Sequence, residues 1–195
     1  TIRAMKYHGG KKVEELNNED LVALEKGFSN LERHIENCSQ HYGLNLVVGI
    51  NHFKTDTDAE IKLVQEKVEK LGFKAILCSH WGEGSKGAEL LAKEAISLAE
   101  KPNQFKYLYD SKDSIKSKLN TIAQNIYRAK DVIFEDEALS QLNVIEDEYA
   151  HLPVCIAKTP YSFSGDAKEI GAASGHTLTI REIRLARGAG FIVAI

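Results

Sequence analysis

The sequence predicts an α/β fold: a parallel sheet with flanking helices, followed by a smaller C-terminal α+β segment. Two short, continuous apolar runs at residues 46–50 and 75–78 have the composition of strands that are covered on both faces. Between them, residues 57–70 combine a helix start signal with apolar residues at helical spacing. Two strands joined by a helix form a parallel unit, and such sheets bind ligands beyond the carboxyl ends of their strands. The residues that follow these two strands are therefore the first candidates for a functional site.

Composition limits the class of protein. The 195 residues suffice for one large domain or two small ones, and 43% hydrophobic with 27% charged residues is typical of a globular protein. A net charge of -3 gives no general electrostatic reason to bind nucleic acid or an anionic membrane. No apolar run has the length of a membrane span, and no signal peptide opens the chain. The first residue is Thr rather than Met, which suggests a processed chain or an excised piece.

The number and spacing of the cysteines indicate the redox environment of the protein. Cys38, Cys78 and Cys155 are few, odd in number and far apart, with neither a disulfide framework nor zinc-ligand spacing. We therefore expect a reducing, cytoplasmic environment.

The N-terminal part is expected to lead into the central unit. Residues 1–12 are basic, contain glycine and show no clear period. Asn18 is the expected N-cap of a helix with Glu19 and Asp20 in its first turn, where acidic groups favour the helix dipole. In the central unit, Thr57 and Glu60 form a capping box for the helix between the two strands.

The rest of the chain alternates between helical and strand patterns. Helices are expected at 88–99, 114–128 and 137–149, and residues 102–109 form a short strand or a docking segment. Strands are expected at 132–134, 153–157, 177–180 and 190–195, with three arginines between the last two. The composition changes after Leu152, where Ser, Gly and other small residues become frequent, so we place an approximate domain boundary near residue 151.

The two strand exits carry the candidate site residues. Asn51, His52, Phe53 and Lys54 follow the first strand, and Ser79, His80 and Trp81 follow the second. Two aromatic rings at adjacent exits are suited to holding a flat heteroaromatic ligand, while Asn51 and Ser79 are possible contacts to its edge. From the pattern alone, ordinary packing of both rings under a loop is an equal alternative.

A glycine-rich loop at residues 82–87 matches G-x-G-x-x-G, the dinucleotide fingerprint. The loop begins three residues after the strand, and the bulky Trp81 stands where the pyrophosphate has to approach. A P-loop is also disfavoured, because Ala88 and Glu89 occupy the positions that require Lys and Ser or Thr. We interpret the segment as a flexible loop that caps a helix and leaves Trp81 room to move.

Other catalytic or metal-binding patterns are weak. Ser162 and Ser164 lack the small residue that a nucleophile elbow needs, and Cys78 lies inside an apolar strand. The alternating acids at 56, 58 and 60 are helix N-terminal acids rather than a metal loop. We therefore expect neither a catalytic residue nor a metal site in this chain. Lys158, at the end of a buried strand, faces either a polar site or a structural ion pair.

Six blocks of sequence, in order, resemble formate–tetrahydrofolate ligase (10-formyltetrahydrofolate synthetase), and together they span nearly the whole chain. The blocks are TIRAMKYHGG (1–10), LEKGFSNLERH (24–34), NHFKTDTDAE (51–60), HWGEGSKGA (80–88), LPVCIAKTPYSFS (152–164) and GAGF (188–191). They correspond to the later part of a much longer enzyme.

The resemblance implies an enzyme that joins formate to tetrahydrofolate with ATP and Mg, by way of formyl phosphate. It also implies a homotetramer activated by a monovalent cation, with the phosphate-binding loop in an N-terminal domain that this chain lacks. By the same resemblance, residues 1–40 are a helical lead-in from that domain, 41–150 an α/β domain with the folate-pocket loops, and 151–195 the start of a C-terminal subdomain.

The resemblance also assigns residues to a pterin pocket. Trp81 matches the stacking tryptophan of the family, Phe53 the aromatic residue beside it and Leu77 an apolar pocket residue. Lys54 stands where many members have proline. We expect this chain to contribute the pocket and to be inactive alone.

Two alternatives remain open. The chain could be a non-catalytic oligomerisation or binding module derived from the enzyme. The chain could also be a dinucleotide-binding oxidoreductase, but only the glycine-rich loop supports that hypothesis.

Overall fold

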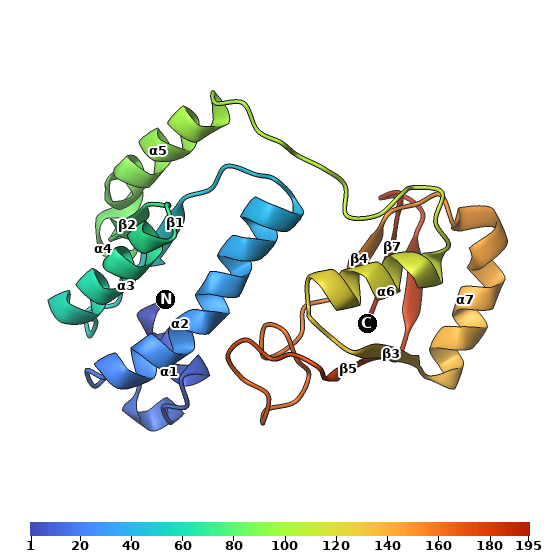
Figure 1. Ribbon diagram of the computed structural model, residues 1–195, viewed down its shortest axis with the longest axis horizontal. Helices are drawn as coiled ribbons and strands as arrows, with labels where there is room; N and C mark the ends of the chain where they lie inside the picture. The colour runs from blue at the N-terminus through green and yellow to red at the C-terminus, as the bar shows by residue number, and fades with distance from the viewer. The chain divides into compact units, whose positions relative to one another are not determined.

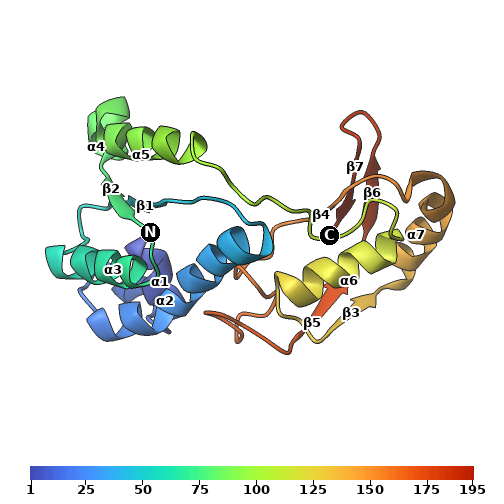
Figure 2. The same cartoon turned by 45° about the horizontal axis from the view of Figure 1, so that its top comes forward.

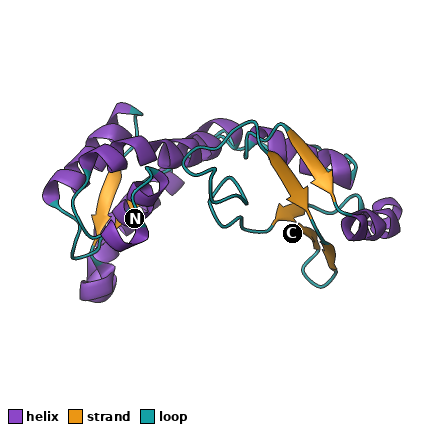
Figure 3. Ribbon diagram, turned by 90° about the horizontal axis from the view of Figure 1, so that it is seen from below, coloured by secondary structure: helices purple, strands orange, loops and turns teal.

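The computed structural model describes residues 1–195, which form two compact units, Thr1–Lys106 and Tyr107–Ile195. Strands flanked by helices make up each unit, which confirms the predicted α/β class (Figure 3). The boundary predicted near residue 151 falls inside the second unit, because helices before it share a hydrophobic core with strands after it. The division expected at residue 40 likewise falls inside the first unit, whose core joins residues on both sides of it.

The first unit is mostly helical. Its elements are α1 (Ile2–His8), η1 (Val13–Glu15), α2 (Leu21–Glu36), η2 (Asn37–His41), β1 (Val48–Asn51), α3 (Asp58–Lys70), β2 (Ala75–Cys78), α4 (His80–Glu83), η3 (Gly84–Ala88) and α5 (Glu89–Ala99). In Figure 1 they occupy the blue to green part of the ribbon.

The β1–α3–β2 unit has the predicted form. β1 and β2 pair in parallel with Val48 opposite Ala75 and Asn51 opposite Cys78, so both strands end at the same edge. The Thr57 hydroxyl accepts a hydrogen bond from the backbone of Glu60, and the Glu60 side chain accepts one from the backbone of Thr57, which confirms the capping box. One face of α3 is buried in the core of this unit.

Residues 2–8, for which the sequence shows no clear period, form α1, capped by the side chain of Thr1. Two local predictions in the first unit are wrong. The N-cap of α2 is Asp20, whose carboxylate accepts from the Ala23 N–H at 2.8 Å, while the carbonyl of Asn18 serves another partner. The glycine-rich loop is two short helical turns, α4 and η3, rather than an open loop.

The second unit contains α6 (Ile115–Asn125), β3 (Asp131–Phe134), α7 (Asp136–Tyr149), β4 (Val154–Ile156), β5 (Thr177–Ile180), β6 (Ile183–Ala186) and β7 (Phe191–Ala194). β3 pairs with β5 in parallel, and β7 lies between β4, to which it is parallel, and the antiparallel β6. The β6–β7 hairpin is visible in Figure 2.

The second unit differs from the expected pattern in its strands. The segment with the three arginines contains β6, in which Ile183 is buried and Arg184 is exposed beside β7. Residues 102–109 form no strand, and Leu108 and Tyr109 pack against the core of this unit, in agreement with the alternative of a docking segment. The strand at 131–134 is present, but it pairs within its own unit rather than with β1 and β2.

No helix of the structure is both long and apolar enough to cross a membrane.

Candidate functional site: a pocket at the ends of β1 and β2

A cavity of about 630 Å³ opens at the carboxyl ends of β1 and β2. Its lining comes from three places: the β1 exit, the β2 exit with α4, and the N-terminal region. The lining residues are Arg3, Asn17, Asn51, His52, Phe53, Lys54, Thr55, Ser79, His80, Trp81, Gly82 and Glu83. The volume falls within the range of small-molecule sites.

The loop after β1 is held in a tight turn by Asp56. The Asp56 carboxylate accepts the backbone N–H of Phe53 at 2.8 Å, and the N–H of Asp56 donates to the carbonyl of Phe53 at 2.9 Å. Thr57 follows at once as the N-cap of α3. The backbone of Phe53 is therefore fixed to the start of a helix, although its ring is 41% exposed.

Arg3 of α1 forms part of the same wall. Its guanidinium carbon lies 5.4 Å from the centre of the Phe53 ring, within the range of a cation–π contact. The guanidinium also donates to the side-chain oxygen of Asn17 at 2.5 Å. A residue near the start of the chain thus touches one of the two candidate stacking rings.

Trp81 presents an open aromatic face. Its side chain is 79% exposed, and the ammonium of Lys54 lies 5.8 Å from its ring centre. In α4, the Ser79 hydroxyl donates to the Glu83 carboxylate, which braces the turn that carries the indole. An exposed indole at the mouth of a cavity leaves apolar, polarisable surface available to a ligand ring.

A buried ion pair lies behind the loop. The Lys6 ammonium and the Glu60 carboxylate are both fully buried and lie 2.7 Å apart, joining α1 to α3. The same carboxylate accepts the backbone N–H groups of Asp20 at 3.0 Å and Thr57 at 3.1 Å. Burial acts to raise the pKa of Glu60, but these hydrogen bonds outweigh it and hold that pKa below its ordinary value.

Most of the predicted site residues line one cavity. Asn51, Phe53, Lys54, Ser79 and Trp81 all line it. Leu77 does not, because its side chain lies in β2 against the hydrophobic core of the unit.

The sequence also places His52 and His80 at these strand exits, and both line the cavity. Sequence reasoning missed the contributions of Arg3, Asn17 and Thr55; Thr55 is the neighbour of Lys54 and could have been included for that reason. Arg3 and Asn17 come from a segment without periodicity, so no local signal pointed to them.

The glycine-rich segment does not have the form of an open nucleotide-binding loop. The glycine-rich segment is helical, and a Cβ at Gly87 would lie 2.5 Å from the backbone of His80, so that glycine serves close packing of the chain on itself. No group of three or more His, Cys, Asp or Glu side chains has metal-binding geometry. Cys78 is buried, and that burial raises the pKa of its thiol, as is usual for a core cysteine.

Known proteins resemble the chain over its full length. The family model described as Formate–tetrahydrofolate ligase matches residues 1–195. The chain is 50% identical to the formate–tetrahydrofolate ligase of Methylococcus capsulatus, 48% identical to that of Methylibium petroleiphilum and 43% identical to that of Methylobacillus flagellatus. All of this chain is matched in each case, but it spans only 35%, 36% and 35% of those proteins. The chain therefore belongs to the formate–tetrahydrofolate ligase family.

Proposed function

We propose that this chain supplies the pterin pocket of a ligase that joins formate to tetrahydrofolate in an ATP-dependent reaction giving 10-formyltetrahydrofolate. Phe53 and Trp81 stack on the pterin ring, Lys54 and Leu77 complete the pocket, and Asn51 and Ser79 contact the edge of the ring. The observation that carries the proposal is the cavity at the ends of β1 and β2, with an exposed indole and a half-exposed phenyl ring in its wall.

The position of Leu77 limits its role. Its side chain packs on the core, so in this proposal it supports the pocket floor from behind. Lys54, in contrast, already lies over one face of Trp81, so the pterin either stacks on the opposite face or displaces the ammonium. A lysine at this place also suits the anionic carboxylates of folates.

The chemistry of phosphoryl transfer is assigned to the part of the enzyme outside this chain. Phosphoryl transfer needs donors and cations arranged around the phosphate oxygens. Arg3 and Lys54 are the only lysine or arginine side chains in the pocket lining, and each already lies against an aromatic ring, which supports this assignment. We propose that a P-loop domain holds ATP and Mg and forms formyl phosphate, that the assembled enzyme is a cytoplasmic homotetramer activated by a monovalent cation, and that this chain alone does not turn over.

Fluorescence tests the stacking role directly, because Trp81 is the only tryptophan of this chain. In the full-length enzyme, the difference between the parent protein and Trp81→Phe isolates the emission of this indole. Stacking of a pterin on the indole is expected to quench its emission in a saturable way, in this chain or in the full-length enzyme. N-acetyl-tryptophanamide corrects for light absorbed by the folate, and p-aminobenzoyl glutamate, which lacks the pterin, is the matched control ligand. Absence of quenching by millimolar tetrahydrofolate in the full-length enzyme would contradict the proposal.

An activity assay tests the division of labour. ATP-dependent and formate-dependent formation of 10-formyltetrahydrofolate is expected from the full-length enzyme and not from this chain. Turnover by the chain alone would show that it contains a phosphate site that the structure does not reveal.

A non-catalytic module is the second candidate. Leu90 and Ile96 on α5 are exposed apolar residues, as expected of a face that another protein surface covers. Under this alternative the chain associates with a partner or with itself but shows no saturable quenching by tetrahydrofolate, so the same titration separates the two functions.

A further inference from the structure

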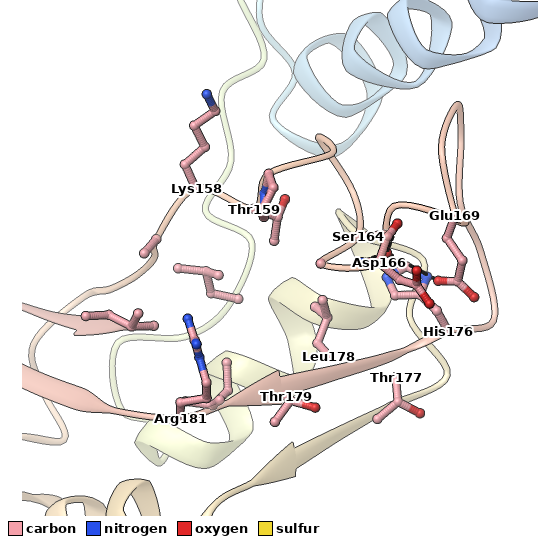
Figure 4. A pocket seen from close by; sticks show the side chains of 16 residues that line it. Lys158, Thr159, Ser164, Asp166, Glu169, His176, Thr177, Leu178, Thr179 and Arg181 are labelled. Carbon is pink, nitrogen blue, oxygen red and sulfur yellow. Dashed lines mark hydrogen bonds between the residues drawn. The ribbon is translucent and has the colours of Figure 1, made fainter. Parts of the chain in front are cut away.

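A second cavity lies wholly within the second unit and is independent of the proposed folate pocket. It has a volume of about 650 Å³ and is bounded by residues 156–160 after β4, by the loop 164–169, by residues 176–181 along β5, and by Ile195. Figure 4 shows Thr159 on one side and Leu178, Thr179 and Arg181 along β5 on the other. The side chains of Ser164, Asp166, Glu169 and His176 gather at one end.

The backbone along β5 has hydrogen-bonding groups directed into this cavity. The carbonyls of His176 and Ile180 accept the N–H groups of Lys130 and Glu135 on the β3 side. Backbone groups of successive strand residues face opposite edges, so those of Thr177 and Thr179 face away from β3. The N–H of Arg181 continues this second row and donates to the carbonyl of Ile195 at 2.7 Å.

A β-bulge joins this row to the β6–β7 ladder. The N–H groups of Arg181 and Glu182 both donate to the one carbonyl of Ile195, and Ile195 donates back to Glu182. Two residues opposite one, with a shared acceptor, are the mark of a bulge. β5 and β6 are therefore one bent strand, and β7 runs antiparallel along it and toward the cavity.

The opposite wall repeats the arrangement. β4 is parallel to β7, with Val154 opposite Ile192, and the N–H of Ala157 extends the ladder to the carbonyl of Ala194. The pairing of β7 with β4 on one side and with the β5–β6 strand on the other can be continued past Ile195. The second residue after Ile195 then lies between Thr159 and Thr179, and the fourth lies opposite Thr177. The cavity therefore has the form of one vacant strand position between two strand edges.

The far end of the slot holds an unsatisfied side chain. His176 is only 7% exposed, and neither of its ring nitrogens has a hydrogen-bond partner. A buried imidazole without partners is costly, so it calls for a polar group that this chain does not itself provide. By the same register, that group belongs near the fifth residue after Ile195.

We propose that the slot receives an extended segment of the same polypeptide that continues β7 beyond Ile195, antiparallel to β5 and parallel to residues 157–160. The curated relatives are long enough to contain such a segment, since this chain spans only about 35% of their length. The inserted strand joins the β3–β5 pair to β4 and β7 in one sheet, and its polar groups satisfy His176.

Hydrogen exchange in the full-length enzyme provides the first test. The amides of Thr177 and Thr179 are expected to be protected there and to exchange at least tenfold faster when the chain is cut after Ile195. The amides of Lys130 and Glu135 are the internal controls, because they donate to the opposite edge of β5 and keep their protection. Fast exchange of Thr177 and Thr179 in the full-length enzyme would overturn the proposal.

A cross-link covers the case in which the shortened chain does not fold. In a full-length protein with its native cysteines replaced by serine, Thr179→Cys is combined with a cysteine at the second residue after Ile195. Paired antiparallel residues lie within disulfide range, so this pair is expected to oxidise readily.

Leu178→Cys with the same partner is the matched control, because adjacent strand residues point to opposite faces. Equal oxidation of both pairs, or of neither, would refute the register. A cross-link that forms only between two copies of the chain would refute insertion within one polypeptide.

Discussion

The buried ion pair between Lys6 and Glu60 is expected to hold the first unit together, and Lys6→Met is the change that tests it. The substitution removes the ammonium but leaves the stem volume nearly filled. The Glu60 carboxylate then stays fully buried with only the backbone N–H groups of Asp20 and Thr57 as donors. Its charge is no longer balanced.

The expected loss of unfolding free energy in Lys6→Met follows from this unbalanced charge. Removing one partner of a buried pair costs about 3–5 kcal/mol, because the remaining ion has neither water nor its counter-ion. The matched control is Lys62→Met, which breaks the pair between Lys62 and Glu66 on the same helix, where the side chains are 75% and 52% exposed. Exposed pairs contribute about 0–1 kcal/mol, so the control should be close to the parent protein.

Urea unfolding followed by circular dichroism at neutral pH measures both free energies, and hydrogen exchange of α1 and α3 assigns the loss to the first unit. Adding Glu60→Gln to Lys6→Met should recover part of the stability, since no charge is then buried and the amide oxygen can still accept the N–H of either Asp20 or Thr57, although not of both. If Lys6→Met costs no more than Lys62→Met, the pair does not stabilise the unit and the reasoning is refuted.

Four further outcomes are expected. The pKa of Glu60 in the folded protein is held below its ordinary value of 4.5, so the stability that Glu60 contributes is complete above about pH 4.5 and is lost as the pH falls through the pKa of the folded state. In Lys6→Met, the unfolding free energy measured in an acid titration should fall by less than in the parent protein. Trp81→Ala in the full-length enzyme should weaken tetrahydrofolate binding by about 1–3 kcal/mol by calorimetry, if base-like stacking energies apply, and an unchanged affinity would reject the stacking role. Lys54→Pro should leave saturable quenching of Trp81 in place but remove its dependence on salt, because the cation beside the indole is lost; an unaltered salt dependence would exclude Lys54 from ligand contact. Lys118→Met should destabilise the second unit by about 1–3 kcal/mol in urea, since its buried ammonium donates to the carbonyls of residues 111, 150 and 152, whereas the exposed Lys112→Met should have little effect.

Lys118 shows why buried cations are hard to find from sequence. It lies on α6 between Ile115 and Leu119, two apolar residues of the helix stripe. Burial lowers the pKa of its ammonium, while the carboxylates of Asp113, Glu146 and Asp110 act in the opposite direction. Its helical spacing places it on the apolar stripe, unlike the exposed Lys116, but the carbonyl groups that accept from it lie before α6 and after α7 and leave no sign in that pattern.

Local signals predicted well where the physics is local. The capping box of Thr57 and Glu60 depends on groups three residues apart, and the apolar runs of β1 and β2 depend on burial of both faces of a strand. The parallel pairing expected of two strands joined by a helix then predicts that Asn51, Phe53, Ser79 and Trp81 lie at one edge, as they do. Element boundaries differ from the expected ones by one to three residues, the end of α6 by most.

Long-range contacts decided the rest. Glu60 reads as an ordinary first-turn acid, yet it is buried against Lys6, 54 residues away in the sequence. The buried residues of the short helix α1, Ile2, Met5 and Lys6, have helical spacing, but one of the three is a lysine, so the apolar pattern is not recognisable. Its stability comes from packing on α2 rather than from its own sequence, as is usual for so short a helix.

The amino-acid sequence by itself determined the α/β class, the order of most elements and the aromatic residues at the two strand exits, because each follows from periodicity, capping and strand composition over a few residues. Only the tertiary structure decided that α6 and α7 share a core with β4 to β7, that Arg3 touches Phe53, and that a strand-shaped slot lies beside β5. These features depend on which distant surfaces exclude water together, and no short stretch of sequence contains that information.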